Sequence, residues 1–258
     1  MSLLVGTFGS YRTKVDFDLI PRRHYAYGIL RAADKAKSRG LDSVTVAEFG
    51  VAAGWGLLNM CEIAKNVSRV TGVEIRIVGF DGGEGLPPPQ DYRDHPDLFR
   101  AGDYPMDREG LMRTLPSNAR LVLGPLKDTV PEFARTLSPQ SPLGFASIDV
   151  DYYSSAKDAF VLFCESDPVK YLPVPGLYFD DITEESQNSW CGELLAINEF
   201  NAEQPLRKIE IDRFLRGRRI FKGGRWIDQI YLLHVLDHPV MQGREIRSHI
   251  ISYGSIKA

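Results

Sequence analysis

The glycine-rich stretch EFGVAAGWG, at residues 48–56, constrains the fold more than any other feature of the chain. An apolar run at 44–49 leads into it, and apolar residues at helical spacing follow over 57–67. A second apolar run, at 75–80, ends at Asp81. Small residues between a strand and a helix allow a tight turn that lies close to a ligand. The order strand, turn, helix, strand therefore predicts the start of an open parallel sheet.

The pattern continues through the rest of the chain. Strand-like runs lie at 120–123, 143–150 and 176–179, and helical spacing occurs at 22–39, 158–165 and 192–202. Two further β-like runs, 206–211 and 227–236, flank a basic stretch at 213–225 and predict an antiparallel hairpin with a solvated connection. We therefore predict an α/β fold with a mostly parallel central sheet, helices on both faces and an antiparallel C-terminal strand pair.

No shift in composition divides the chain, so we expect a single domain over residues 1–258. Its expected parts are an N-terminal helical segment at 1–43, an insertion at 85–117 and a hairpin at 204–240 that closes the sheet. The insertion is rich in charge and in proline (Pro87, Pro88, Pro89, Pro96, Pro105 and Pro116). Long surface segments of this kind often carry function, and we expect it to cover the ligand site as a lid.

The turn predicts a nucleoside ligand without a pyrophosphate, such as S-adenosylmethionine. The dinucleotide fingerprint G-x-G-x-x-G is absent because Asn59 stands three residues after Gly56, and no G-x-x-x-x-G-K-[ST] phosphate loop occurs. At the end of its strand, Asp81 can accept hydrogen bonds from both ribose hydroxyls. We expect Glu48 to meet the cationic end of the ligand, directly or through the turn. The alternative is a plain strand–helix connection with solvated acids.

Two acidic pairs follow predicted strands, Asp149 with Asp151 and Asp180 with Asp181. The carboxyl ends of parallel strands meet in one crevice, where carboxylates repel one another unless a charge compensates them. A hard divalent cation with oxygen ligands would do so. Asp180 and Asp181 can share one ion only if the chain turns between them, because neighbouring strand residues point to opposite faces. The alternative is that these acids cap the next helix or bind backbone amides.

Six stretches together resemble the macrocin O-methyltransferase family, a branch of the class I S-adenosylmethionine-dependent methyltransferases that includes antibiotic sugar methylators. They are EFGVAAGWG (48–56), FDGGEGLPPP (80–89), LGPLKDTVPEF (123–133), IDVDYYSS (148–155), FDD (179–181) and GELLAINEF (192–200). They keep the family's order and cover most of residues 22–240. The resemblance implies a Rossmann-like class I methyltransferase fold and O-methyl transfer to a small-molecule hydroxyl, on a sugar or a glycoside.

The resemblance also implies roles for individual residues. Magnesium would be held by Asp149, Asp180 and Asp181, and Asp151 would act as the general base. The implied cofactor contacts are Glu48, Gly50, Val51, Ala52, Ala53, Gly54, Asp81, Gly82, Gly124 and Asp149. Some positions depart from the family: Val150 stands where glycine is usual, Gly82-Gly83 where a small polar and an aromatic residue are usual, and Pro125-Leu126 where an aromatic pair is common. The resemblance therefore does not name the acceptor.

Composition excludes several partners. A formal charge of -3 provides no general attraction to nucleic acid or to an anionic membrane, and no apolar run is long enough to span a bilayer. We find no signal-peptide pattern, and three widely separated cysteines suggest a reducing cytoplasm. The sequence leaves homo-oligomerisation open.

Three other functions remain as alternatives. The first is a metal-independent methyltransferase in which the acids are structural. The second, an NAD(P)-linked oxidoreductase, is disfavoured by the missing third glycine. The third is a non-catalytic S-adenosylmethionine-binding protein, which the four acids at the strand ends argue against.

Overall fold

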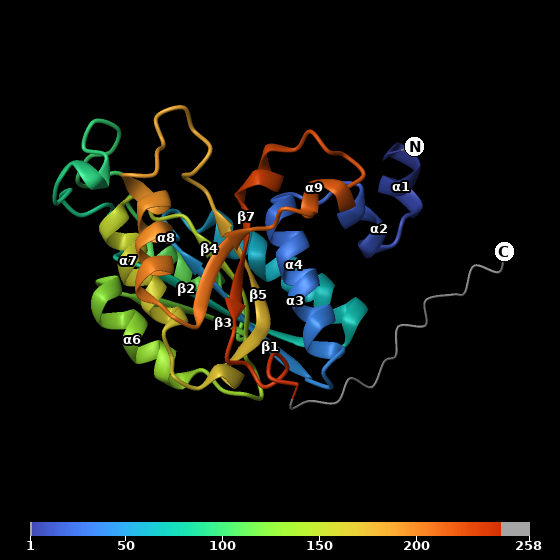
Figure 1. Ribbon diagram of the computed structural model, residues 1–258. Coiled ribbons are helices and arrows are strands. Elements are labelled where there is room, and N and C mark those ends of the chain that lie inside the picture. The colour runs from blue at the N-terminus through green and yellow to red at the C-terminus, as the bar shows by residue number, and fades with distance from the viewer. Residues whose placement is uncertain (1, 244–258) are drawn as a thin grey trace.

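The computed structural model describes residues 2–243 of the 258-residue chain, so residues 1 and 244–258 of the expected domain lie outside the described part. Its centre is a seven-stranded sheet in the order β3-β2-β1-β4-β5-β7-β6 (Figure 1). The first five strands of this order pair in parallel, and β7 is antiparallel to both β5 and β6. The strands are β1 (Ser43–Phe49), β2 (Glu74–Asp81), β3 (Ala119–Leu123), β4 (Leu143–Ile148), β5 (Tyr171–Phe179), β6 (Arg207–Ile211) and β7 (Ile230–Val235).

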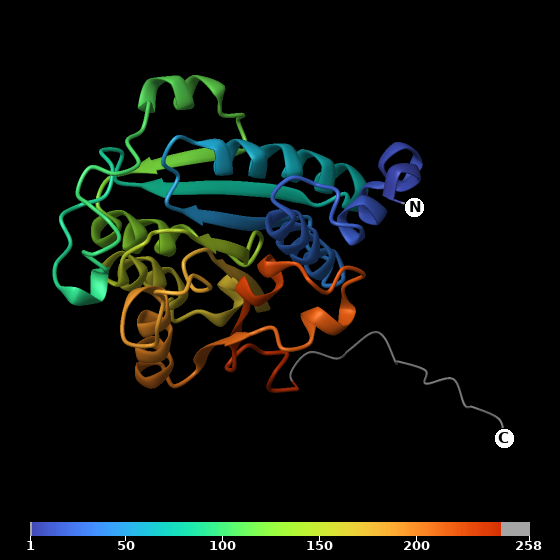
Figure 2. The ribbon, with the colours of Figure 1, turned by 90° about the horizontal axis from the view of Figure 1, so that it is seen from above.

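Helices cover both faces of this sheet (Figures 1 and 2). One face carries α3 (Arg23–Lys37) and α4 (Trp55–Thr71), and the other carries α6 (Leu126–Thr136), α7 (Tyr153–Phe160) and α8 (Gly192–Glu203). The shorter helical segments are α1 (Ser2–Phe8), α2 (Tyr11–Asp16), η1 (Tyr92–Asp94), α5 (Arg108–Thr114), η2 (Val161–Phe163), η3 (Pro168–Lys170), α9 (Leu215–Arg218) and η4 (Arg225–Gln229). The predicted α/β fold class, with its antiparallel C-terminal pair, is confirmed.

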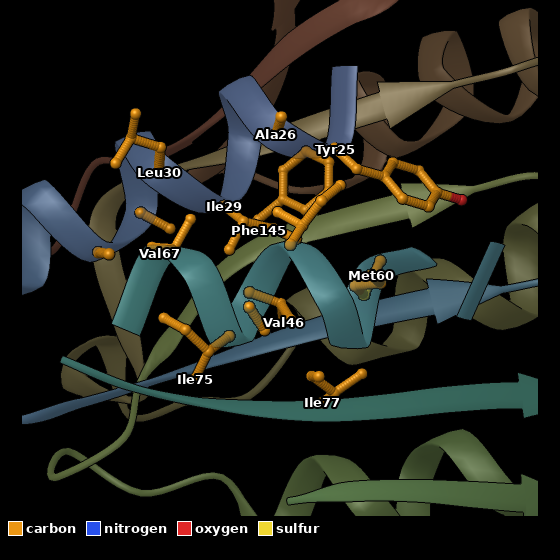
Figure 3. Close-up of a cluster of buried hydrophobic side chains, with 14 of the residues drawn as sticks. Tyr25, Ala26, Ile29, Leu30, Val46, Met60, Val67, Ile75, Ile77 and Phe145 are labelled. Atoms are coloured by element: carbon orange, nitrogen blue, oxygen red, sulfur yellow. The ribbon is translucent and has the colours of Figure 1, made fainter. Parts of the chain in front are cut away.

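The core consists of two layers because neighbouring strand residues point to opposite faces. Val46 of β1 faces the cluster under α3 and α4, whereas Ala47 belongs to the cluster under α6, α7 and α8. Figure 3 shows the first cluster, where Tyr25 and Ile29 of α3 lie beside Phe145 of β4. Every residue of β1 and of β4 is buried, as expected for central parallel strands covered on both faces.

The register of the central strands aligns their carboxyl ends. Phe49 of β1 pairs with Phe80 of β2 and with Ile148 of β4, and Ile148 pairs with Phe179 of β5. The residues that follow these four are Gly50, Asp81, Asp149 and Asp180, which therefore lie along one edge of the sheet. Strand order reverses between β1 and β4, and open α/β sheets bind ligands at this point.

Three local predictions were wrong in detail. The helix expected at 158–165 begins at Tyr153, directly after the acidic pair, and Val161–Phe163 continue it only as a 3-10 turn. Strand β5 begins at Tyr171, well before the expected 176. Its first half was not predicted because it contains Pro173 and Pro175, and proline argues against a central strand. Helix α6 was not predicted, since Pro131 lies inside it.

The basic stretch 213–225 differs most from its prediction as a solvated connection. It contains α9 and the buried Arg219. Arg219 forms an ion pair at 2.7 Å with Asp18, whose side chain is also buried, and donates to the backbone carbonyls of Val15 and Asp16 at 2.6 and 3.0 Å. This basic residue therefore joins the N-terminal helices to the C-terminal hairpin. Among the described helices, none combines the length and the apolar character that crossing a bilayer requires.

We predict that Gly28→Ala destabilises the protein by about 1–3 kcal/mol, measured by urea unfolding. Gly28 lies within α3, and a methyl group there would overlap the ring of Phe145. Helix propensity alone favours alanine over glycine by up to about 1 kcal/mol, so a loss has to come from packing. The control is Gly217→Ala in α9, where no atom lies within 4 Å of the added methyl group. Equal effects of the two substitutions would contradict this packing argument.

Candidate active site

The turn after β1 is pressed against the end of β4. Gly50 has a φ of 83°, and a side chain there would overlap the carbonyl oxygen of Asp149, so both conformation and space require glycine. Its N–H donates to the carbonyl of Phe80 at 3.0 Å. Gly54, with a φ of 85°, is the N-cap of α4. The predicted strand–turn–helix geometry is present, and it lies directly beside the acidic strand end.

Asp81 holds this turn in place. One oxygen of its carboxylate accepts hydrogen bonds from the N–H groups of Val51 and Ala52 at 2.9 and 2.8 Å, and the other accepts from Gly83 at 2.6 Å. A carboxylate can accept about four hydrogen bonds, so one site remains available. The predicted ribose contact of Asp81 stays a prediction. The structure adds a second role, as the anchor of the turn.

Glu48 lies beneath the turn rather than on an open surface. It is only 1% exposed, and one carboxyl oxygen accepts a 2.6 Å hydrogen bond from the Tyr25 hydroxyl, which itself accepts from Ser147 at 3.1 Å. The other oxygen has no partner in the described part of the chain. Burial raises the pKa of Glu48 to about 7, although the Tyr25 hydrogen bond opposes the shift. Any influence of Glu48 on a ligand would therefore act through the turn.

A cavity of about 1080 Å³ opens at this edge of the sheet, and many of the residues predicted for the site line it. The lining residues among them are Gly50, Ala52, Asp81, Gly82, Gly124, Asp149, Asp151, Asp180 and Asp181. The other predicted residues, Glu48, Val51, Ala53 and Gly54, are not part of the lining. The segment 85–117 also contributes to the lining, through Gly85, Leu86, Pro87, Pro88, Gln90, Phe99, Tyr104 and Arg108, and Glu84 lines the cavity just before it.

Three carboxylates converge inside this cavity. Asp149, Asp180 and Asp181 each offer one oxygen, and these three oxygens lie within 4.8 Å of one another. Backbone hydrogen bonds fix the first two residues, from Asp149 N–H to the Phe49 carbonyl at 3.0 Å and from Asp180 N–H to the Ile148 carbonyl at 3.1 Å. Because β5 ends at Phe179, the chain turns after it and Asp181 reaches the same point. These three side chains could hold a hard cation through oxygen atoms.

The electrostatics show how strongly these acids repel one another. Burial raises the pKa of Asp181 to about 8, with contributions from Asp151 and Asp180. Burial also raises the pKa of Asp149 well above its usual value, and Asp180 and Asp181 add to this shift. One buried oxygen of Asp181 has no hydrogen-bond partner in the described structure. A cluster of this kind favours either bound protons or a bound cation.

Asp151 stands at the start of α7 with unusual backbone geometry. Its φ is 60°, in the left-handed region that few residues other than glycine adopt. Its side chain lines the cavity although the residue is only 9% exposed. Burial, followed by the charge of Asp180, raises the pKa of Asp151 to about 7. Such strain persists where the surrounding structure fixes a residue, often at functional sites.

Two residues that support the cluster were not predicted from the sequence. The Tyr178 hydroxyl donates to Asp180, and its ring stacks on His24 with centroids 4.0 Å apart. Glu193 is fully buried in the first turn of α8 and accepts from Asp181 N–H at 3.3 Å. The signal for Tyr178 was its place two residues before Asp180, on the same strand face. The sequence signal for Glu193 was an acidic residue in the first turn of a predicted helix.

Trp190 is 73% exposed, and His95 is buried. Neither lines the cavity.

No protein-family model and no curated protein sequence matches the chain. Among solved structures it is similar to CalS11, described as a calicheamicin methyltransferase, with 18% sequence identity and a TM-score of 0.53 over 90% of this chain and 89% of that one. It is also similar to the O-methyltransferase NovP, with 18% identity and a TM-score of 0.51 over 74% of this chain and 77% of that one. The likeness shows a shared fold, the Rossmann-like fold of these methyltransferases.

The raised pKa of Asp181 predicts an unusual dependence of stability on pH. The folded protein keeps this carboxyl protonated up to about pH 8, whereas the unfolded chain loses the proton near 3.8. The folded state therefore binds more protons between these values, and stability falls as the pH rises. We predict that Asp181→Asn raises the melting temperature by a few degrees more at pH 8 than at pH 5, measured in chelator.

The matched control for this prediction is Glu132→Gln, which removes a charge at an exposed position of α6. It should change the melting temperature little at either pH. An Asp181→Asn effect of the same size at both pH values would show that repulsion within the cluster does not limit stability.

Proposed function

We propose that the protein is an S-adenosylmethionine-dependent O-methyltransferase, assisted by Mg²⁺ or another hard divalent cation, that methylates a hydroxyl of a sugar, glycoside or related small molecule. The observation that carries the proposal is the convergence of Asp149, Asp180 and Asp181 in the cavity that also reaches the glycine turn. One cavity thus offers both a nucleoside pocket and a place to activate a hydroxyl. Membership of the macrocin O-methyltransferase family is part of this proposal, supported by the six matching stretches.

The cofactor would occupy the end of the cavity formed by the turn. Gly50, Ala52, Asp81, Gly82 and Gly124 line this end, so backbone approaches the ligand closely and Asp81 keeps an acceptor site. Val51, Ala53 and Gly54 would act by shaping the turn, and Glu48 by placing negative charge beneath it. When bound, S-adenosylmethionine supplies the methyl group on a sulfonium. The acidic surroundings favour that cation.

The acids fit a divalent cation for three reasons. All the offered ligand atoms are carboxylate oxygens, which hard cations prefer. One buried oxygen of Asp181 has no partner. The raised pKa of Asp149 arises first from burial and then from Asp180 and Asp181, a repulsion that a cation would relieve. A bound Mg²⁺ would supply positive charge that lowers the pKa of the acceptor hydroxyl.

Asp151 is the proposed general base. It lines the same cavity, and its pKa of about 7 places it where a carboxylate can take a proton near neutral pH. The proton of the acceptor hydroxyl would pass to a carboxylate oxygen of Asp151, which would leave the hydroxyl oxygen able to take a methyl group. Bound S-adenosylmethionine would supply that group, with its S–CH₃ bond broken and S-adenosylhomocysteine as the leaving thioether. The main contribution of the protein would be to align the two reactants.

The segment 85–117 would act as a lid, because several of its residues line the cavity into which the strand ends point their acids. A nucleic acid or membrane partner is not part of the proposal, and a homo-oligomer stays open. The cytoplasmic location stays a prediction from the sequence. The three cysteines on which it rests, Cys61, Cys164 and Cys191, are free thiols in the structure.

We predict that Asp151→Asn slows methyl transfer by about 100- to 10,000-fold, the usual contribution of a general base. Cofactor binding, measured by calorimetry with S-adenosylhomocysteine, should change little, because Asp151 does not belong to the turn. Transfer would be followed with a panel of sugars, glycosides and phenols as acceptors. Normal turnover of the variant would exclude Asp151 as the base, and failure of the wild type to bind the cofactor would exclude the proposed function.

We predict that Mg²⁺ raises the melting temperature of the wild-type protein and that Asp149→Asn removes most of this increase. The expected cause is the loss of one of three carboxylate ligands. Thorough chelation should abolish methyl transfer, and added Mg²⁺ should restore it. Full activity after chelation would favour a metal-independent methyltransferase with structural acids. The control is Asp107→Asn at the N-cap of α5. Asp107 does not line the cavity and is not one of the three clustered carboxylates.

A further inference from the structure

Three residues of adjacent strands form a row directly beneath the residues that border the site. The strand register pairs Glu48 of β1 with Ser147 of β4, and Ser147 with Tyr178 of β5. Because side chains alternate between the faces of a sheet, each residue of the row shares a face with the residue two positions further on. Those residues are Gly50, Asp149 and Asp180. The row therefore lies where it can support the turn and the carboxylates.

Tyr178 uses its place in this row to reach Asp180. Its hydroxyl donates a hydrogen bond to Oδ1 of the Asp180 carboxylate. Tyr178 is only 4% exposed, and a buried hydroxyl requires a partner. An apolar residue, which is usual in a central parallel strand, would supply no such donor. Hydrogen bonds to carboxylates are among the strongest that proteins make, so this contact restricts the rotation of the Asp180 side chain.

The main chain of Asp180 is held from both sides. Its N–H donates to the Ile148 carbonyl at 3.1 Å, and its own carbonyl accepts from the side-chain amide of Gln229 at 2.7 Å. With the main chain fixed, the freedom that Asp180 keeps is the rotation of its side chain. The Tyr178 hydroxyl acts on that rotation, and so on the direction in which the carboxylate points.

The first turn of α3 keeps the Tyr178 ring in place. His24 stacks on this ring with centroids 4.0 Å apart and an interplanar angle of 11°, and Tyr25 packs edge-on against it at 6.2 Å. Burial, and then the charges of Arg22 and Arg23, lower the pKa of His24 to about 3, so its ring is neutral near pH 7. Its buried Nε2 atom has no hydrogen-bond partner in the described part of the chain. His24 therefore acts on Tyr178 through the face of its ring rather than through a charge.

We propose that Tyr178 is a positioning residue for the cation site and that His24 fixes its ring for this role. Tyr178 turns the Asp180 carboxylate toward the point that it shares with Asp149 and Asp181, so that the ligands are oriented before a cation binds. This role rests on the cation part of the proposed function. Affinity for the cation then depends on two residues that do not line the cavity. Residues that orient metal ligands in this way usually contribute about 10- to 100-fold to metal affinity.

The dissociation constant of Mg²⁺ tests this role, because its measurement needs no methyl acceptor. It is determined by calorimetry on the full-length protein after removal of metal with chelator. We expect Tyr178→Phe to weaken Mg²⁺ binding by about 10- to 100-fold, because the ring stays and only the donor is lost. The alternative is that Asp180 merely satisfies a buried hydroxyl, so that the substitution changes stability alone. An unchanged or tighter dissociation constant would overturn the proposal.

Tyr171→Phe is the matched control on the same strand. Tyr171 begins β5 and is 1% exposed, and its hydroxyl donates to the Leu162 carbonyl at 2.9 Å and accepts from the Glu165 N–H at 2.8 Å. The substitution removes a hydrogen-bonded hydroxyl from a buried ring at the end of β5 far from the carboxylates. It should lower stability and leave Mg²⁺ binding unchanged. A loss of affinity equal to that of Tyr178→Phe contradicts the positioning role.

Two substitutions of His24 test the part that α3 plays. His24→Phe keeps a flat ring against Tyr178 and should bind Mg²⁺ with nearly wild-type affinity, whereas His24→Ala should weaken binding toward the level of Tyr178→Phe. Combined with Tyr178→Phe, His24→Ala should add little further loss, since both residues act through the same carboxylate. Equal losses in the two His24 variants, or fully additive losses in the double variant, would contradict the role of His24.

The wild-type protein separates the two levels of failure. If it binds S-adenosylhomocysteine but not Mg²⁺ at millimolar concentration, the cation part of the proposed function fails, and the role of Tyr178 fails with it. If it binds Mg²⁺ and Tyr178→Phe binds the ion equally well, only the role of Tyr178 fails.

Discussion

The contact between Gly50 and the carbonyl of Asp149 is the constraint on which the rest of the site depends. It joins the turn after β1 to the last residues of β4, at the point where strand order reverses. Hydrogen bonds from Gly50 to Phe80 and from Asp149 to Phe49 fix the same three strand ends. The glycine turn and the carboxylate cluster thus share one wall of backbone. A change of conformation in the turn would displace Asp149 as well.

The sequence predicted those parts of the structure that arise from local patterns. The apolar runs of β1 and β2 and the glycines between them specify strand, turn and helix wherever they occur. The convergence of the acids was also predictable, because carboxyl ends of parallel strands share an edge. The first half of β5 and the whole of α6 were not predicted, because each contains proline at positions that such elements usually avoid. Tertiary packing outweighed this local signal.

Other features of the site depend on contacts that no local pattern encodes. Glu193 looks like an ordinary acid in the first turn of a helix, and only the packing of α8 buries it beneath Asp181. The hydrogen bond from Tyr178 to Asp180 follows from the side on which β5 presents both residues. A second cavity, of about 530 Å³, is lined by residues 98–99 and 184–187, which lie far apart in the chain. Spacing alone could not have related these two segments.

The ion pair between Arg219 and Asp18 has a consequence for how the chain is made. The two residues are 201 positions apart, so the N-terminal helices cannot complete their packing until almost the whole chain has been synthesised. Contacts of such long sequence separation slow folding, because a large loop must close before the contact contributes. During translation Asp18 leaves the ribosome early and stays solvated. This ion pair is therefore a late contact, although Asp18 is synthesised early and α2 also packs against α3 and α4.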